Sequence, residues 1–294
     1  MQKYIGKAAA KLVNAPLKIA RPRFKHQATP EQFTYVVAAY TAEQRKDGWY
    51  TSKSVPSFAN EKPKWSGPFE TVENNMAGVE AVLKAAVRFN CKLFFASSSE
   101  VYGQSPKPRL SEDDALLVFS NQGGRSSYVL SKLMGEHLCH NYFDRYQLPV
   151  VIGRFFNVVG PRQTGRYGMV LPRFVEAALA GRPLVVHDDG HQVRCFAHVH
   201  DVVRSLLELM DTDAAVAGVF NIGSDQPTSI LQLAKSVIAA VNPKLEIVFQ
   251  TYAEAYEGDF EDVRSRIPDL SRLRRTIHYR PEFDLEATIQ DVIE

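Results

Sequence analysis

The chain has 294 residues, of which 45% are hydrophobic and 23% are charged, an ordinary composition for a soluble globular protein. Its formal charge of +2 is too small to indicate a nucleic-acid partner, and no apolar run approaches the roughly 20 residues that a membrane-spanning helix needs. Three widely spaced cysteines, Cys91, Cys139 and Cys195, argue against a disulfide framework. We therefore expect buried free thiols and a cytoplasmic location.

Residues 1–67 form an atypical N-terminal segment without clear periodicity. Seven lysines and arginines precede the first acidic residue, Glu31, which favours a solvated basic tail over a transit peptide or an anion-binding arm. One short apolar run, residues 33–39, predicts a buried strand. A helix is conceivable from Gly6 onwards.

From residue 68 the pattern alternates between helices and strands. A helix is predicted over 70–89, a buried strand over 91–96, a long helix over 126–146 and a strand over 149–155. Such alternation favours right-handed crossovers and a parallel sheet. Further helices are predicted at 170–180, 201–210, 228–241 and after Asp269, and further strands at 184–187, 194–199, 218–223 and 245–249.

Tyr128 and Lys132 are four residues apart in the predicted long helix, so they share one face. An ammonium group beside a phenol favours the phenolate and lowers its pKa from about 10. A phenolate can accept a proton from a sugar hydroxyl while a hydride leaves the same carbon. The pair alone is weak, because a Tyr-x-x-x-Lys spacing also occurs by chance.

The residues that follow the strand at 91–96 strengthen this interpretation. Ser97, Ser98, Ser99 and Glu100 stand at its carboxyl end, where open α/β sheets bind ligands. Hydroxyls and a carboxylate there can polarise a substrate oxygen and supply a second acid or base. The alternative is a simple hydroxyl-capped turn.

Four histidines at 187, 191, 198 and 200 also merit attention as metal ligands, but their spacing is better explained by a turn and a strand before a helix. We expect no metal site. Asp201 is predicted to cap the helix that follows it.

Eight ordered segments between residue 68 and the C-terminus resemble the extended short-chain dehydrogenase/reductases that act on nucleotide sugars, close to UDP-glucose 4-epimerases and UDP-glucuronate decarboxylases. They include Ser97-Ser-Ser-Glu-Val-Tyr-Gly, Tyr128-Val-Leu-Ser-Lys, Arg154-Phe-Phe-Asn and Arg194-Cys-Phe-Ala-His. The resemblance implies an α/β fold, a Rossmann-like parallel sheet with helices on both faces, and a small C-terminal α/β substrate domain. It implies a cofactor domain at 68–153 and about 192–226, and a substrate domain at about 154–191 and 227–294.

The resemblance also implies roles for individual residues. Tyr128 would be the catalytic base, with Lys132, Ser98 and Glu100 as its catalytic partners. NAD would be the cofactor and a UDP-sugar the substrate. Residues that would contact the cofactor are Asn75, Ser97, Ser98, Tyr128, Lys132 and Phe156. Residues that would contact the substrate are Asn157, Arg194 and Arg266, the two arginines pairing with diphosphate oxygens.

The sequence departs from the family at its start. Members open with a strand and a glycine-rich turn for the cofactor pyrophosphate, but residues 1–66 contain only Gly6 and Gly48. The first strands are therefore expected to be absent or rearranged. Three explanations compete: a natural deletion, a truncated reading frame, and a different N-terminal arrangement that captures the cofactor.

The predicted function is UDP-sugar 4-epimerisation through a 4-keto intermediate. The alternatives are decarboxylation or dehydration within the same family, and a pseudoenzyme that binds a nucleotide sugar or a paralogue without catalysis. A homodimer, or pairing with a paralogue, through the helices at 75–89 and 126–146 is also expected.

Overall fold

The computed structural model describes residues 36–38, 42–45, 48–51, 68–118, 123–163, 165, 169–255 and 263–294. The conceivable helix at Gly6 and most of the basic N-terminal segment lie outside them. The chain divides into two compact units. The first comprises Met1–Gly103, Ala115–Arg154 and Leu209–Phe220, and the second comprises Gln104–Asp114, Phe155–Glu208 and Asn221–Glu294. The segment 192–226, predicted to belong to the cofactor domain, is shared between them.

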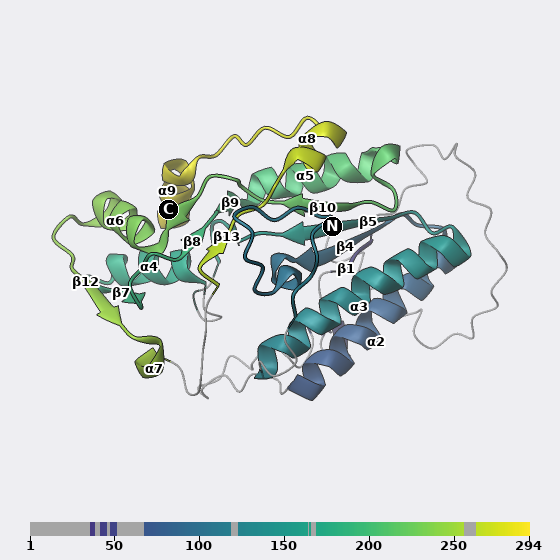
Figure 1. Cartoon of the computed structure of the whole chain (residues 1–294), viewed down its shortest axis with the longest axis horizontal. Helices are drawn as coiled ribbons and strands as arrows, with labels where there is room; N and C mark the ends of the chain where they lie inside the picture. The colour runs from purple at the N-terminus through teal and green to yellow at the C-terminus, as the bar shows by residue number, and fades with distance from the viewer. Residues whose placement is uncertain are drawn as a thin grey trace. The chain divides into compact units, whose positions relative to one another are not determined.

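The first unit is built on a four-stranded sheet in the order β1-β4-β5-β10 (Figure 1). Strands β1 and β4 are parallel, with Val36 opposite Leu93. Backbone bonds from Ala217 to Val150 and from Ile152 to Gly218 ascend together, as in a parallel pair. The predicted parallel α/β sheet is confirmed. The strands are β1 (Val36–Ala38), β4 (Leu93–Ser98), β5 (Val150–Phe155) and β10 (Val219–Ile222).

Two long helices, α2 (Pro68–Phe89) and α3 (Gly123–Tyr146), lie side by side in this unit (Figure 1). The predicted apolar face of α2 is buried at Leu83 and Ala86, both 0% exposed, whereas Val72 near its start is exposed. Helix α3 approaches β4 closely at Gly135, where an added Cβ would come 2.3 Å from the Phe95 ring. This close approach brings the polar face of α3 to the end of β4.

The N-terminal segment contributes more regular structure than its sequence pattern predicts. The strand expected at 33–39 is present as β1. A second pair, β2 (Ala42–Arg45) and β3 (Gly48–Thr51), is antiparallel, with Arg45 opposite Gly48. This hairpin was not predicted from the sequence. Strand β2 is polar and β3 has Trp49 and Tyr50 next to one another, so neither shows the alternation of apolar and polar residues that predicts a strand.

The second unit has an apolar core formed by α4 (Val170–Leu179), α6 (Ile230–Val241), α9 (Leu285–Ile293) and β7 (Leu184–His187). Strand β7 pairs in parallel with β12 (Ile247–Gln250). The single strand predicted at 194–199 is wrong. It is two short strands, because β8 (Val193–Arg194) pairs with β11 (Thr228–Ser229) and β13 (Ser265–Arg266), whereas β9 (Ala197–His198) pairs with β6 (Val158–Val159). The remaining elements are η2 (Ser99–Tyr102), α5 (Val199–Asp211), η4 (Asp213–Ala215), α7 (Tyr252–Ala255) and α8 (Ser271–Thr276).

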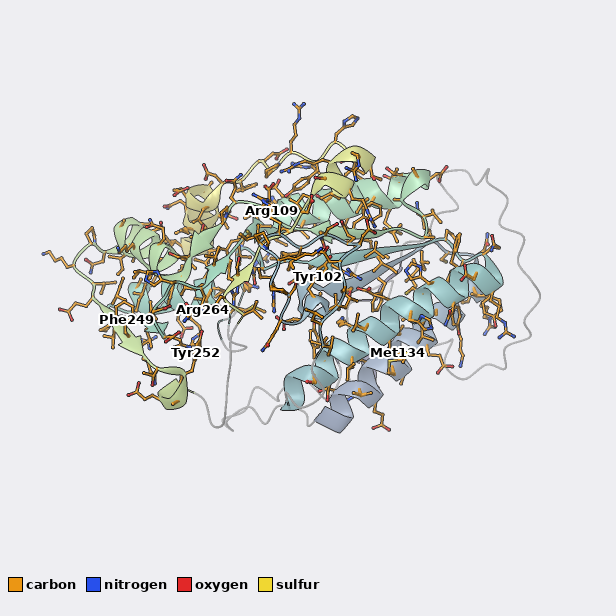
Figure 2. All side chains as sticks on the ribbon, viewed as in Figure 1. Tyr102, Arg109, Met134, Phe249, Tyr252 and Arg264 are labelled. Atoms are coloured by element: carbon orange, nitrogen blue, oxygen red, sulfur yellow. The ribbon has the colours of Figure 1, made fainter. Side chains whose placement is uncertain are left out.

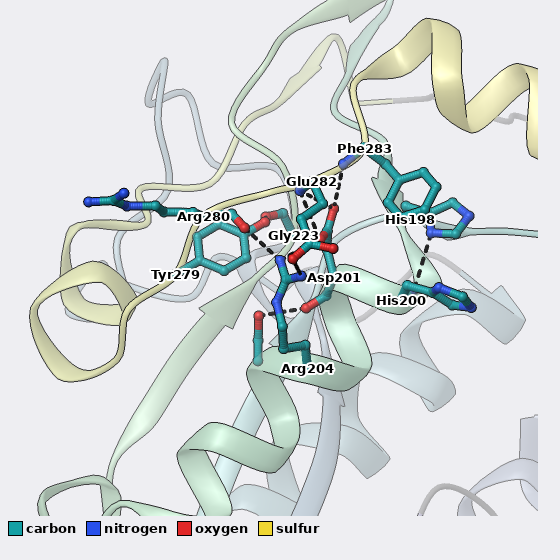
Figure 3. Close-up of polar contacts among 10 residues, drawn as sticks. His198, His200, Asp201, Arg204, Gly223, Tyr279, Arg280, Glu282 and Phe283 are labelled. Carbon is teal, nitrogen blue, oxygen red and sulfur yellow. Dashed lines mark hydrogen bonds and ion pairs between the residues drawn. The ribbon is translucent and has the colours of Figure 1, made fainter.

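Asp201 anchors the C-terminal segment of the second unit (Figure 3). Its carboxylate, 1% exposed, accepts hydrogen bonds from the backbone N–H of Glu282 at 3.0 Å and of Phe283 at 3.2 Å. Arg204 donates to the same carboxylate at 2.6 Å. The predicted helix-capping role is therefore wrong, because Asp201 lies within the first turn of α5 and its oxygens face another segment.

His198 adds a second contact to the same segment. Its ring is fully buried and stacks on Phe283 with centroids 3.8 Å apart (Figure 3). Its Nε2 lies 2.8 Å from the Asp291 carboxylate. The backbone N–H of His200 donates to Nδ1 at 3.3 Å, so Nε2 carries the proton and donates to Asp291. Among the described residues, no group of three or more metal-binding side chains is placed to hold an ion.

Candidate active site

Tyr128 and Lys132 face the carboxyl end of β4 from the first part of α3. The Lys132 ammonium donates to the carbonyl oxygen of Ala96 at 2.9 Å and lies 5.7 Å from the centre of the Tyr128 ring. Only 7% of Lys132 is exposed, whereas Tyr128 is partly exposed. Burial lowers the pKa of Lys132 to about 8, although the charge of Glu136 opposes that shift. The predicted pair is therefore brought together, with the ammonium in a poorly solvated position.

The serine-rich end of β4 turns directly into the short helix η2. Ser98 precedes it, and its side-chain oxygen accepts a hydrogen bond from the backbone N–H of Glu100 at 3.2 Å. The hydroxyl-capped turn is thus present, and the catalytic role expected for these residues stays a prediction. Ser98 and Glu100 are partly exposed, while Ser97 and Ser99 are buried. A strand end of this kind offers a hydroxyl and a carboxylate beside the Tyr128 helix.

Sequence reasoning assigned no role to Glu136 or Arg154, which form a buried ion pair in this unit. Arg154 donates from Nε to Oε1 of Glu136 at 3.0 Å and from Nη2 to Oε2 at 2.7 Å, and both residues are 5% exposed. Ser97 donates its hydroxyl to the same Oε1. Burial opposes the Arg154 charge, but the bonds and charge of Glu136 outweigh it and raise the Arg154 pKa. Glu136 follows Lys132 by four residues, a spacing that the sequence displays.

Asn75 connects α2 to the same stretch of α3. Its amide donates to the Ser131 hydroxyl at 2.8 Å, and Ser131 in turn donates to the carbonyl oxygen of Tyr128 at 2.7 Å. The predicted cofactor-side residue is therefore joined to the backbone of the predicted base through one hydroxyl.

The substrate-side residues predicted from three separate motifs belong to the second unit. Arg194 and Arg266 stand opposite one another in the parallel pair β8 and β13, so their side chains share one face. They are 9% and 5% exposed. Asn157 donates to the carbonyl oxygen of Cys195, the neighbour of Arg194, at 3.1 Å. The structure thus brings together residues that lie far apart in the sequence.

Phe156, predicted on the cofactor side, is fully buried in the second unit. Its Cβ lies close to Gly223, where an added Cβ would come within 2.8 Å of it. Its backbone N–H donates to the carbonyl oxygen of Ile222 at 2.9 Å.

In the part of the chain that the structure describes, no helix is long and apolar enough to cross a lipid bilayer.

A parallel sheet with a Tyr-x-x-x-Lys helix at the carboxyl end of a serine-ended strand defines a protein of the short-chain dehydrogenase/reductase class. The family model for the NAD dependent epimerase/dehydratase family matches residues 59–223. The chain belongs to the NAD dependent epimerase/dehydratase family.

Curated relatives of this chain are enzymes of nucleotide-sugar metabolism. UDP-N-acetyl-alpha-D-glucosaminuronate decarboxylase of Bacillus cytotoxicus is 36% identical over 226 residues, covering 76% of this chain and 70% of that protein. UDP-glucuronic acid decarboxylase 5 of Arabidopsis thaliana is 31% identical over 221 residues. The match covers 74% of this chain and 61% of the Arabidopsis protein, so this chain spans less than two thirds of that relative's length.

Solved structures with the same fold include two epimerases. UDP-glucuronic acid 4-epimerase from Bacillus cereus, in complex with NAD and UDP-4-deoxy-4-fluoro-glucuronic acid, gives a TM-score of 0.66 at 27% identity, covering 76% of this chain and 67% of that one. UDP-glucose 4-epimerase from Thermotoga maritima, with UDP-glucose, gives 0.68 at 26% identity, covering 77% and 70%.

Proposed function

We propose that this chain transforms a UDP-sugar by transient oxidation at C4, with Tyr128 as the proton acceptor. The observation that carries the proposal is the buried Lys132 ammonium, which bonds to Ala96 and lies 5.7 Å from the Tyr128 ring. A buried positive charge favours the phenolate, and a phenolate is the base that removal of the O4 proton needs. Ser98 orients the same sugar hydroxyl.

The cluster fits the nicotinamide end of NAD. Tyr128 and Lys132 would hold the ribose beside that ring, and Ser97 and Asn75 fix the surrounding backbone through their bonds to Glu136 and Ser131. NAD, when bound, supplies hydride acceptance and return at C4. The glycine-rich turn that receives its pyrophosphate in the family is not among the described residues.

The substrate class that we propose is a UDP-hexuronate. Three of the relatives named above, both decarboxylases and the Bacillus cereus epimerase, carry a uronic acid in their names. Arg194 and Arg266, paired across β8 and β13, would bind the diphosphate, and Asn157 would bind the sugar side.

Epimerisation and decarboxylation share this first step. Oxidation at C4 of a hexuronate gives a β-keto acid, from which the C6 carboxylate leaves as CO2 unless the hydride returns first. Epimerisation is the outcome that the sequence favoured. Decarboxylation is a second candidate, favoured by Glu100 at the end of β4 and by the two decarboxylase relatives.

The test combines cofactor analysis with turnover. Purified protein is denatured and its supernatant assayed for NAD(H), and the native protein is incubated with UDP-glucuronate. We expect a C4 epimer or a UDP-pentose with CO2, and Tyr128→Phe should lower the rate by about 10²–10⁴-fold. A protein without turnover, in which calorimetry shows UDP binding but no NAD binding, would be the pseudoenzyme instead.

We also propose a homodimer through α2 and α3, in the cytoplasm. Leu130 and Met134, one turn apart on α3, are 50% and 49% exposed, and Val72 on α2 is 37% exposed (Met134 is labelled in Figure 2). Large apolar side chains gathered on one helix pair favour a protein partner. Analytical ultracentrifugation of Leu130→Glu should show a monomer where the natural protein is a dimer.

The cytoplasmic location that we propose rests on the cysteines. All three are free and buried, which supports a reducing compartment.

A further inference from the structure

Glu136 occupies an unusual place among the polar groups of the first unit. It follows Lys132 by one helical turn, is 5% exposed, and its carboxylate accepts from both Ser97 and Arg154. No role in the reaction follows from the sequence motifs for this residue. Its contacts reach both the catalytic helix and the strand end that carries Ser98.

Two residues of α3 bind the end of β4. Lys132 binds the carbonyl oxygen of Ala96 at 2.9 Å, and Glu136 accepts the hydroxyl of Ser97, the next residue. Two successive turns of α3 therefore fix two successive residues of β4, immediately before Ser98 and Glu100. Arg154 locks the carboxylate from β5 through two bonds, and its guanidinium lies 4.9 Å from the centre of the Tyr102 ring in η2.

The charge of Glu136 opposes the loss of the Lys132 proton. Burial disfavours the ammonium, and Glu136 opposes this effect. Lys132 lies on α3 with Tyr128 and Glu136 one turn away on either side, and Arg154 reaches Glu136 from β5. η2 adds Glu100 and Tyr102, and β4 carries no titratable side chain. Helix α2, which packs against α3, carries Glu70, Glu73, Glu80, Lys84 and Arg88. Of these, the Glu136 carboxylate is a buried anion one helical turn from Lys132.

We propose that Glu136 is a positioning residue that keeps the buried Lys132 ammonium charged and, through Ser97, fixes the strand end that presents Ser98 and Glu100. Arg154 holds the carboxylate in the geometry that both tasks need. The link to catalysis rests on the proposed function, but the electrostatic role is a property of the chain without substrate.

The experiment measures the pKa of Lys132 by NMR on protein labelled with 13C-lysine, with the signal assigned by its loss in Lys132→Arg. Glu136→Gln should lower the pKa of Lys132, with an acid dissociation constant about tenfold higher, because burial is then unopposed and the Arg154 charge remains. Arg154→Met should not lower the Lys132 pKa, because the Glu136 carboxylate stays. In the double variant the Lys132 pKa should lie between those of Glu136→Gln and the natural protein. This variant leaves no unpaired buried charge, so it controls for misfolding of the single variants.

An exposed pair on α2 gives the matched control. Glu80 and Lys84 have the same spacing on the surface, and the bond that Lys84 donates to the Glu80 carboxylate raises the Lys84 pKa. Glu80→Gln should shift the Lys84 signal and leave that of Lys132 unchanged. An unchanged Lys132 pKa in both Glu136→Gln and the double variant would overturn the proposal, as would an equal drop in Arg154→Met.

Activity gives a separate readout. If the chain turns over a UDP-sugar, the pH profile of kcat for Glu136→Gln should move in step with the Lys132 pKa, and Glu136→Asp should partly restore it. If Glu136→Gln lowers the Lys132 pKa but the natural protein shows no turnover, the proposed function is wrong and the electrostatic role of Glu136 still holds.

Discussion

The two units assemble their polar clusters from different kinds of structure. In the first unit, Tyr128, Lys132 and Glu136 lie on one face of a 24-residue helix, against strands of six residues each. In the second, Arg194 and Arg266 lie on strands of two residues, and their proximity depends on the register between β8 and β13.

This difference has a physical consequence. A long helix fixes the spacing of its side chains by its own hydrogen bonds, so the first cluster needs only the contact of α3 with β4 and the Arg154 bonds from β5. Two-residue strands have few hydrogen bonds of their own, and their positions depend on the strands and the core around them. We therefore expect charge substitutions to act locally in the first unit and through the packing in the second.

The largest effect is expected from Lys132 itself. Because burial lowers its pKa from 10.5 to about 8, the unfolded chain binds more protons between those values, and its contribution to the unfolding free energy rises with pH by roughly 3 kcal/mol. In urea titrations, the stability advantage of Lys132→Met over the natural protein should shrink from pH 8 to 10.5. Cys139 and Tyr279 have raised pKa values, which make stability fall as pH rises. Both proteins contain these residues, so their contributions cancel in the difference between the two unfolding free energies. A constant difference across that window would contradict the assignment.

The next effect concerns the anchor of the second unit. Asp201→Asn removes the charge from a buried carboxylate that accepts two backbone N–H groups and Arg204. We expect a loss of about 2 kcal/mol in unfolding free energy, since hydrogen bonds to charged groups contribute about 1.5–3 kcal/mol. Glu286→Gln, on the exposed face of α9, is the control and should cost less than about 1 kcal/mol. Equal losses in both variants would show that Asp201 is no anchor.

A smaller effect is expected at the arginine pair. Arg266→Lys replaces a planar guanidinium by a point charge and should weaken UDP binding about tenfold in calorimetry. Arg264→Lys, two residues earlier, is the control, because Arg264 is exposed and paired with Asp189 at 2.8 Å (Figure 2). If Arg264→Lys weakens binding as much as Arg266→Lys, the diphosphate site lies elsewhere.

The smallest effect is a difference in thiol labelling between the units. Burial raises the pKa of Cys139 in the first unit and of Cys195 in the second to about 12, so both should react slowly with iodoacetamide at pH 8. Asp201→Asn should speed labelling of Cys195 and leave Cys139 unchanged, as quantified by mass spectrometry. Faster labelling at both cysteines would mean that the two units open together.

Hydrophobic periodicity predicted most of the regular structure from residue 68 onwards, because those helices and strands bury one face or both. It failed where burial does not set the pattern. The hairpin β2–β3 has no apolar period. The run 194–199 divides between two sheets because its two halves have different partner strands. Asp201 was misassigned because its partners, Glu282 and Phe283, are about 80 residues away in the sequence.

The sequence by itself determined the family and the Tyr128–Lys132 face, because a four-residue spacing on a helix places two side chains together whatever surrounds them. Tertiary structure alone decided the burial of Lys132, the Glu136–Arg154 pair, and the register that sets Arg194 beside Arg266. Desolvation and strand register arise only when distant segments pack together. The spacing of residues along the sequence therefore predicts neither.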